Sequence, residues 1–327
     1  MKIRKTTLIF IITFFTICLL SCGEEGIREN LGEVYHLYDG NIPLNPKFSP
    51  AGNTIFFHDR EEISEPFNYR CYVAIIGENG DNFNELGMGG LSFSSISGLS
   101  ISPDGNWISF SGIEYEEYGK LNSERDIYKM SSDGSYIEGL GLEGKISDTC
   151  WSTDGEWIYF VWHINSPERD EIYRIRPDGT GIENIGIEHY DINSLSITND
   201  NKYIVYIFIE GESSKLAVYS IEGNEFWVVV DEEDIGGYTI HSSCVSPDGR
   251  WICYSRASDT GGYDLFVVPF YGGESVKITK CGIGYLKLDG GDFSPDWSKD
   301  GKWIVFSAIR LNGEGIFKVK VPDEFLP

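Results

Sequence analysis

Histidine and carboxylate side chains are the residues of this sequence best suited to hold a metal ion. Four of the five histidines fall between hydrophobic, strand-like stretches; they are His58, His163, His189 and His241. Imidazoles that converged with nearby carboxylates would form a metal centre. The chain has no His-x-His or His-Glu-x-x-His pair, so we favour polar residues scattered along one face. We therefore expect no metal, no cofactor and no catalytic residue.

Serine and cysteine chemistry has equally little support in the sequence. There is no Gly-x-Ser-x-Gly elbow of the kind that presents a nucleophilic serine. The seven cysteines include no Cys-x-x-Cys pair. Cys244 and Cys253 flank one predicted turn symmetrically, which leaves both a cross-strand disulfide and two free thiols open. Free buried thiols are the state we favour for most of the cysteines.

The net charge excludes two classes of function. The 327 residues include 26 Lys and Arg against 51 Asp and Glu, which gives a formal charge of −25. Nucleic-acid binding needs clustered basic side chains, and so does docking on an anionic membrane surface. The 38 glycines and 14% aromatic residues instead indicate a folded, turn-rich β-protein.

The first 22 residues have the layout of an export signal. A basic start, Lys2 to Lys5, precedes an apolar run over residues 8–20 that is too short to span a bilayer comfortably. The following Leu19-Leu20-Ser21-Cys22 resembles the lipobox of bacterial lipoproteins. The resemblance implies a signal peptide over 1–21, lipid attachment at Cys22 and an acidic tether over 22–32. An ordinary secretory signal and an uncleaved anchor are the alternatives.

One short phrase recurs along the rest of the chain. It reads hydrophobic–Ser–Pro–Asp–Gly in its clearest copies, and its last residue returns at intervals of 46 to 53 residues. The six copies end at Gly52, Gly105, Gly155, Asn201, Gly249 and Gly301. Proline and aspartate suit the middle of a type I turn, and glycine or asparagine then takes the left-handed conformation that closes a hairpin.

Each turn is followed by a strand that carries bulky residues on both faces. The third residue after the turn is always Ile, and the fifth is always Phe or Tyr. These two positions share one face of a strand, because side chains alternate. The second residue, which is Trp in four of the six copies, belongs to the opposite face. We therefore expect both faces of these strands to be covered.

A four-stranded unit that repeats about every 40–50 residues is typical of a β-propeller blade. The sequence thus predicts an all-β, six-bladed propeller of antiparallel blades over residues 33–322, with a short tail over 323–327. The sixth copy supplies only three strands, and residues 33–38 can supply the fourth. We expect this N-terminal strand to close the last blade. A solenoid of stacked sheets is the alternative.

The Ser-Pro-Asp-Gly turns, with the aromatic-Ile-x-aromatic strands that follow, resemble the TolB-like propeller repeat, a bacterial relative of WD-type repeats. The resemblance covers about residues 33–322. TolB carries an α/β domain before its propeller, whereas only about ten residues separate Cys22 from the first strand here. The resemblance therefore implies a fold and carries no specific role, because propellers host many functions.

Function is expected on the face opposite the turns, where the connecting segments vary in length and composition. Loops are predicted over 58–70, 111–125 and 161–170, and the candidate partner face comprises Tyr115, Tyr118, Trp162, His163, His189 and His241. We expect a monomeric, lipid-anchored scaffold of the cell envelope that binds an envelope protein or glycan. In a Gram-negative host it would lie on the periplasmic or outer side of the outer membrane. The alternative is a carbohydrate-binding propeller, or one resembling the metal-dependent lyases of pectate fragments, that uses the central funnel.

Overall fold

The computed structural model describes residues 28–41, 43–63, 69–115, 124–142, 144–165, 168–258, 262–281, 290–310 and 313–327. Cys22 and Tyr118 lie outside these ranges. Within them the chain is built of β-strands and one short 3₁₀ helix, η3 (Asp323–Phe325). No helix among the described residues is long and apolar enough to cross a membrane. The all-β class predicted from the sequence is confirmed.

Strands that are neighbours in the sequence pair antiparallel within each repeat. The first two repeats contain β3 (Leu44–Phe48), β4 (Thr54–Glu62), β5 (Tyr69–Gly77) and β6 (Asn84–Glu85), then β7 (Phe93–Ile101), β8 (Trp107–Glu114), β9 (Asp126–Ser131) and β10 (Ile137–Gly139). The next two contain β11 (Ile146–Trp151), β12 (Ile158–Asn165), β13 (Glu168–Ile175), the long β14 (Glu183–Ile197), which serves both repeats, β15 (Tyr203–Glu210), β16 (Ser213–Ser220) and β17 (Glu225–Asp231). The last two contain β18 (Ile240–Val245), β19 (Trp251–Ala257), β20 (Tyr263–Pro269), β21 (Val276–Lys277), β22 (Gly291–Trp297), β23 (Trp303–Arg310) and β24 (Gly313–Lys320).

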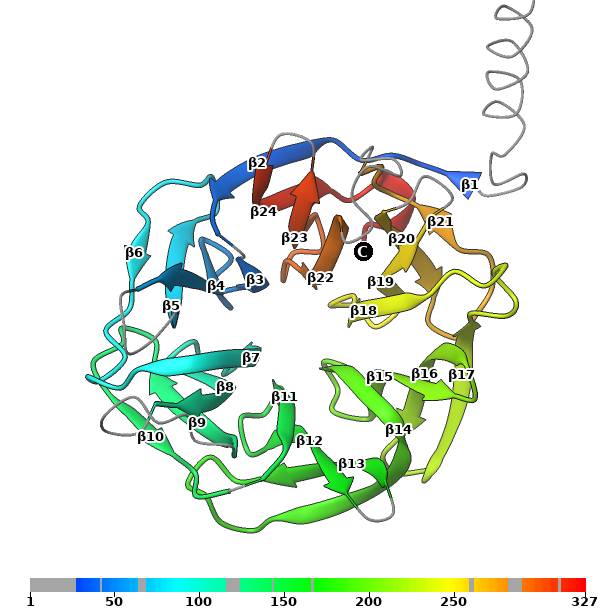
Figure 1. The fold of residues 1–327 in the computed structure, drawn as a ribbon. Coiled ribbons are helices and arrows are strands. Elements are labelled where there is room, and N and C mark those ends of the chain that lie inside the picture. The colour runs from blue at the N-terminus through cyan, green and yellow to red at the C-terminus, as the bar shows by residue number, and fades with distance from the viewer. Residues whose placement is uncertain are drawn as a thin grey trace, which may run out of the picture.

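The sheets are arranged like spokes around a central opening, with the first strand of each repeat innermost (Figure 1). Two N-terminal strands complete the rim. β2 (Val34–Asp39) runs antiparallel to β24, and β1 (Arg28–Glu29) runs parallel to β21. The backbone N–H groups of Asn30 and Gly32 also donate to carbonyls beside β21, each over 2.9 Å. Residues 28–32, which belong to the predicted tether, are therefore held against the rim.

Five of the six turns share one hydrogen-bonding pattern, seen clearly at the second copy, and the first turn has Ala51 in place of the aspartate. The Ser102 hydroxyl donates to Asp104 Oδ1 over 2.6 Å and accepts the N–H of Trp107 over 2.9 Å. Gly105 has a φ of 75°, and the other five turn residues have φ between 58° and 78°, as the sequence predicted. The serine–aspartate bond recurs in the third, fifth and sixth copies, and threonine replaces serine in the fourth.

The predicted core positions are confirmed on both faces of the second strands. All six isoleucines after the turns are at most 1% exposed, and the six aromatic residues two positions later are fully buried. These side chains pack between neighbouring sheets. Ile108, for example, belongs to the same apolar cluster as Val73 of the preceding repeat. On the opposite face three of the four half-buried tryptophans, Trp107, Trp157 and Trp303, have a basic side chain over the ring, with Lys129 over Trp107 at 4.8 Å.

The predicted loops at 58–70 and 161–170 are wrong, because strands occupy most of both segments. β4 continues to Glu62 and β12 to Asn165, and strand pairing resumes at Tyr69 and Glu168. The 111–125 segment is likewise strand up to Glu114. Cross-strand pairs explain the error. The polar residues of these segments resemble loop sequence. In the structure they lie opposite polar partners on the neighbouring strand and bond to them.

The predicted tail packs against the propeller. Phe325, in the predicted tail, is 3% exposed and packs edge-on against Trp251 at 5.0 Å.

Cys244 and Cys253 face each other in register on β18 and β19 as free, buried thiols. Burial raises the pKa of the Cys253 thiol well above its usual value, so it remains protonated.

Candidate functional site

The central channel is walled by the innermost strands, and each of these strands is interrupted. Register shifts occur in β3, β7, β11, β14, β18 and β22. In five of them the residue four positions before the turn serine or threonine is left-handed: Asn45 (φ 50°), Gly98 (61°), Asp148 (42°), Ser194 (61°) and Ser294 (50°). Such a bulge bends the strand and re-aims its side chains. All five residues line the channel.

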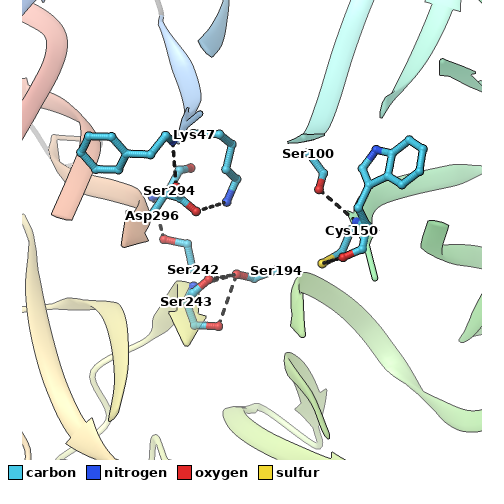
Figure 2. Close-up of polar contacts among 10 residues, drawn as sticks. Lys47, Ser100, Cys150, Ser194, Ser242, Ser243, Ser294 and Asp296 are labelled. Atoms are coloured by element: carbon cyan, nitrogen blue, oxygen red, sulfur yellow. Dashed lines mark hydrogen bonds and ion pairs between the residues drawn. The ribbon is translucent and has the colours of Figure 1, made fainter. Parts of the chain in front are cut away.

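Backbone N–H groups on these strands donate hydrogen bonds to side chains of the neighbouring repeat (Figure 2). The Ser194 N–H donates to Asp148 Oδ2 over 2.8 Å. Further bonds of this kind run from Ser243 N–H to Ser194 Oγ (2.6 Å), from Ser294 N–H to Ser242 Oγ (2.8 Å) and from Trp151 N–H to Ser100 Oγ (3.0 Å). The channel wall is therefore joined from one repeat to the next by polar contacts, which fix the positions of its side chains.

An ion pair joins the first and last repeats across the channel wall (Figure 2). Lys47 Nζ lies 3.3 Å from Asp296 Oδ1, and Asp296 Oδ2 accepts the N–H of Phe48 over 2.9 Å. Burial raises the pKa of Asp296, although Lys47 opposes that rise. Burial also acts to lower the pKa of Lys47, but the Asp296 carboxylate outweighs it and the pKa is raised.

A cavity of about 430 Å³ occupies the channel at the end away from the turns. Apolar atoms form most of its accessible lining, and the polar side chains that reach it include Asn45, Asp148, Asp191, Asn193, Ser194 and His241. A second cavity of about 310 Å³ lies at the turn end. The first is suited to a small polar ligand, because it offers hydroxyl, amide, carboxylate and imidazole groups on a fixed frame.

Arg125, at the start of the third strand of the second repeat, adds a positive charge among hydroxyl groups. Its guanidinium donates to Ser95 Oγ over 2.6 Å, to Ser97 Oγ over 3.1 Å and to Ser111 Oγ over 3.3 Å. Among the described side chains, no carboxylate forms an ion pair with it. Burial lowers its pKa, although the nearby Asp148 opposes that effect.

Three of the histidines singled out from the sequence lie in separate environments. His58 is buried beside Asn45, 3.0 Å from Nε2 to Nδ2, and burial lowers its pKa to about 4. His189 stacks on Phe208 with ring centroids 3.9 Å apart, and burial lowers its pKa. His241 lines the larger cavity and is also held below its usual pKa by burial. The described residues contain no group of three His, Cys, Asp or Glu side chains placed to hold a metal.

The aromatic candidates are likewise dispersed. Tyr115 donates its hydroxyl to the backbone carbonyl of Tyr69 over 2.9 Å. Trp162 packs against Tyr173, with centroids 5.3 Å apart, and so belongs to the strand rather than to a loop. The structure therefore does not bring the candidates into one cluster: Trp162 and His163 lie on β12, His189 on β14 and His241 on β18, and Tyr115 directly follows β8.

His163 forms a contact set that the sequence did not reveal. Its Nε2 lies 2.8 Å from Ser147 Oγ, and its Nδ1 lies 2.6 Å from Asp170 Oδ1. Asp170 Oδ2 accepts the N–H of Ile192 over 2.8 Å. Ser147, His163 and Asp170 come from three successive strands, β11, β12 and β13. Only the pairing register brings them together, so spacing alone carried no signal.

Comparisons with known proteins bear on the fold alone. No protein-family model and no curated protein matches the sequence. TolB from Acinetobacter baumannii is similar in structure (TM-score 0.56, 16% identity), covering 91% of this chain and 66% of that one. The β-propeller domain of the Trilobed protease from Pyrococcus furiosus (TM-score 0.55, 14% identity) covers 87% of this chain and 94% of that one. An oligogalacturonate lyase in complex with manganese (TM-score 0.57, 11% identity) covers 88% and 80%. The chain therefore has the architecture of propeller proteins that include TolB.

Proposed function

We propose that this protein is a monomeric six-bladed propeller, anchored in the cell envelope by a lipid on Cys22, that binds a partner through the face opposite its turns. The six inner strands support the blade number, since each begins one antiparallel unit. The pairing of β2 with β24 supports closure by the N-terminal strand. The lipobox-like Leu19-Leu20-Ser21-Cys22 supports the anchor.

The observation that carries the binding proposal is the cavity of about 430 Å³ at the centre of this face, where polar side chains project from a partly apolar wall. The hydrogen bonds between repeats hold its walls in place, so a ligand meets a site that needs little reorganisation. The strands that surround it end in the segments whose length and composition differ from repeat to repeat. The turn end, in contrast, is built from one repeated pattern.

The partner proposal is tested by shortening the segment over 116–123 to a Gly-Ser linker, which leaves β8 and β9 intact. Cross-linking in the native cell should then lose the partner that the unaltered chain captures. A matched variant on the opposite face, Lys299→Ser, should retain it. Capture that survives the shortening, in a chain with unchanged thermal stability, would show that this segment is not the contact.

A carbohydrate ligand is the second candidate, and the cavity lining favours it. Hydroxyl, amide and carboxylate groups, which the cavity presents, are the usual partners of sugar hydroxyls. Titration calorimetry with neutral and acidic oligosaccharides tests this candidate. Binding that is lost in an Asp191→Asn, His241→Ala double variant supports it. Binding that is unchanged in that variant places the sugar elsewhere.

The metal-dependent form of this candidate is not proposed, because the described histidines and carboxylates do not assemble into a ligand set. Metal analysis of the purified chain checks this directly. One equivalent of a divalent ion that survives dialysis would restore the lyase-like interpretation, and a stoichiometry near zero would leave only metal-free binding.

A further inference from the structure

The contacts of Ser147, His163 and Asp170 have the geometry of a nucleophile, a base and an orienting carboxylate. The serine oxygen lies 2.8 Å from the imidazole Nε2, and the carboxylate Oδ1 lies 2.6 Å from Nδ1. Both distances fall within the range in which a base takes a proton and a carboxylate orients the base. We propose that Ser147 is an activated nucleophile and that this site hydrolyses small carboxylic esters, an activity beyond the binding function.

Internal repetition shows that this arrangement is not imposed by the fold. His163 stands eight residues after its turn glycine, where the other repeats have Arg60, Ile113, Ile209, Ala257 and Ile309. The second repeat also has a serine at the position of Ser147, namely Ser97. Ser97 contacts Ser111 over 2.8 Å and Arg125, and a base is not among its partners. The two serines thus share a backbone position and differ in chemistry.

The hydrogen bonds also set the protonation state that a base requires. Asp170 is held by the Ile192 N–H and faces Nδ1, so the proton of neutral His163 resides on Nδ1. The lone pair on Nε2 is then directed at the Ser147 hydroxyl, which donates to it. The Asp170 side chain is 9% exposed and that of His163 is 32% exposed. The orienting group is therefore shielded while the base remains open to solvent.

The reaction follows from these positions. Ser147 Oγ adds to the ester carbonyl carbon as its proton passes to His163 Nε2. The bond to the alcohol then breaks, and the alcohol leaves with that proton. Water attacks the acyl-serine, Nε2 takes one proton from the water and returns it to Ser147, and a carboxylic acid is released. Asp191 is exposed and precedes Ile192, whose N–H binds Asp170, and its negative charge favours uncharged over anionic esters.

Covalent labelling of the full chain in detergent by a fluorophosphonate tests the nucleophile. We expect one phosphonyl group per chain, on the peptide that contains Ser147, and no label on that peptide in Ser147→Ala. In His163→Gln the labelling rate should fall about a hundredfold or more, which is the contribution of a general base. Ser97→Ala is the matched control and should label at the rate of the unaltered chain. Thermal unfolding confirms that each variant is folded.

Hydrolysis of p-nitrophenyl acetate provides the second measurement. We expect turnover that Ser147→Ala abolishes. Asp170→Asn tests the positioning role, since it should move the pH profile as well as the rate. Equal labelling of Ser97 and Ser147, or a rate unchanged in folded His163→Gln, would overturn the proposal. Neither result affects partner capture, so failure here is separable from failure of the binding function.

Discussion

The turns and the channel wall hold their aspartates in opposite ways. In the turns the Ser102 hydroxyl and backbone N–H groups lower the pKa of Asp104. On the channel-lining strands burial raises the pKa of Asp148 and Asp296, and that of Asp292 to about 6. The turn aspartates repeat and stabilise the fold in their charged form. The channel aspartates do not repeat, and their charged form is disfavoured.

Asp292 shows the contrast most sharply. Four other repeats have isoleucine at its position, six residues before the turn serine or threonine: Ile96, Ile146, Ile192 and Ile240. Asp292 is fully buried and binds Arg310 through both carboxylate oxygens, over 2.9 and 2.6 Å. The position that is isoleucine in four other repeats is therefore occupied by an ionisable side chain in the sixth. Stability alone therefore does not account for its presence.

The largest expected effect is from Asp292→Ala. Arg310 would be left buried without a partner, and the free energy of unfolding should fall by about 3–5 kcal/mol. Replacing both residues with isoleucine should be neutral or stabilising, because the pair is desolvated and isoleucine is the residue that four other repeats use at the position of Asp292. Urea unfolding measures all three chains. A loss below about 1 kcal/mol in the single variant would mean that Arg310 finds solvent or another partner.

The pH dependence of stability gives the next largest effect. The folded pKa of Asp292 lies near 6, above the unfolded value of 3.8, so the folded chain binds this proton more tightly. Its contribution is therefore complete below pH 3.8 and is lost as the pH rises to about 6, in total about 3 kcal/mol. Urea unfolding at pH 4, 5, 6 and 7 should show that decline. A chain carrying Asp292→Asn should lack this component, and an identical profile in the two chains would contradict the assignment.

Serine-to-alanine changes in the turns should have smaller and uniform effects. Ser152→Ala removes the hydroxyl that donates to Asp154 and accepts the Trp157 N–H, as Ser246→Ala does in its own turn. Each should lower the free energy of unfolding by about 1–2 kcal/mol. Thermal unfolding compares the two. A difference between them greater than about 1 kcal/mol would show that the turns are less alike than their geometry indicates.

The smallest expected change in stability is at the cavity rim. Asp191 is exposed, so Asp191→Asn should alter the free energy of unfolding by less than about 0.5 kcal/mol. Its effect should appear only in ligand titration. A loss of stability comparable to that of the turn variants would show that Asp191 supports the channel wall rather than a ligand.

The fold was accessible from the sequence because its determinants are local and repeated. The left-handed turn residues, such as Asn201, and the buried isoleucines, such as Ile204, stand at fixed offsets within one hairpin. Each can be identified without knowing how distant strands pair. The strand over residues 33–38 could also be anticipated, since the sixth repeat lacked a partner for its last strand.

The candidate site was less accessible because it depends on register. Ser147, His163 and Asp170 become neighbours only once β11, β12 and β13 pair in the observed alignment. Polar residues at the strand ends, such as Arg70 and Glu61, read as loop although they pair across two strands. The channel interruptions also escape detection, since asparagine, aspartate and serine occupy the left-handed position without a shared motif.

The docking of β1 along β21 has a consequence for how the propeller meets a membrane. Arg28 pairs with Val276 at the rim, so only residues 22–27 would separate the proposed lipid on Cys22 from the folded edge. That stretch reaches about 20 Å at most. A chain anchored in this way would keep the β21 edge within that distance of the lipid surface. When the disc meets the membrane by this edge, both ends of the channel open parallel to the membrane, and a partner or ester approaches along the surface.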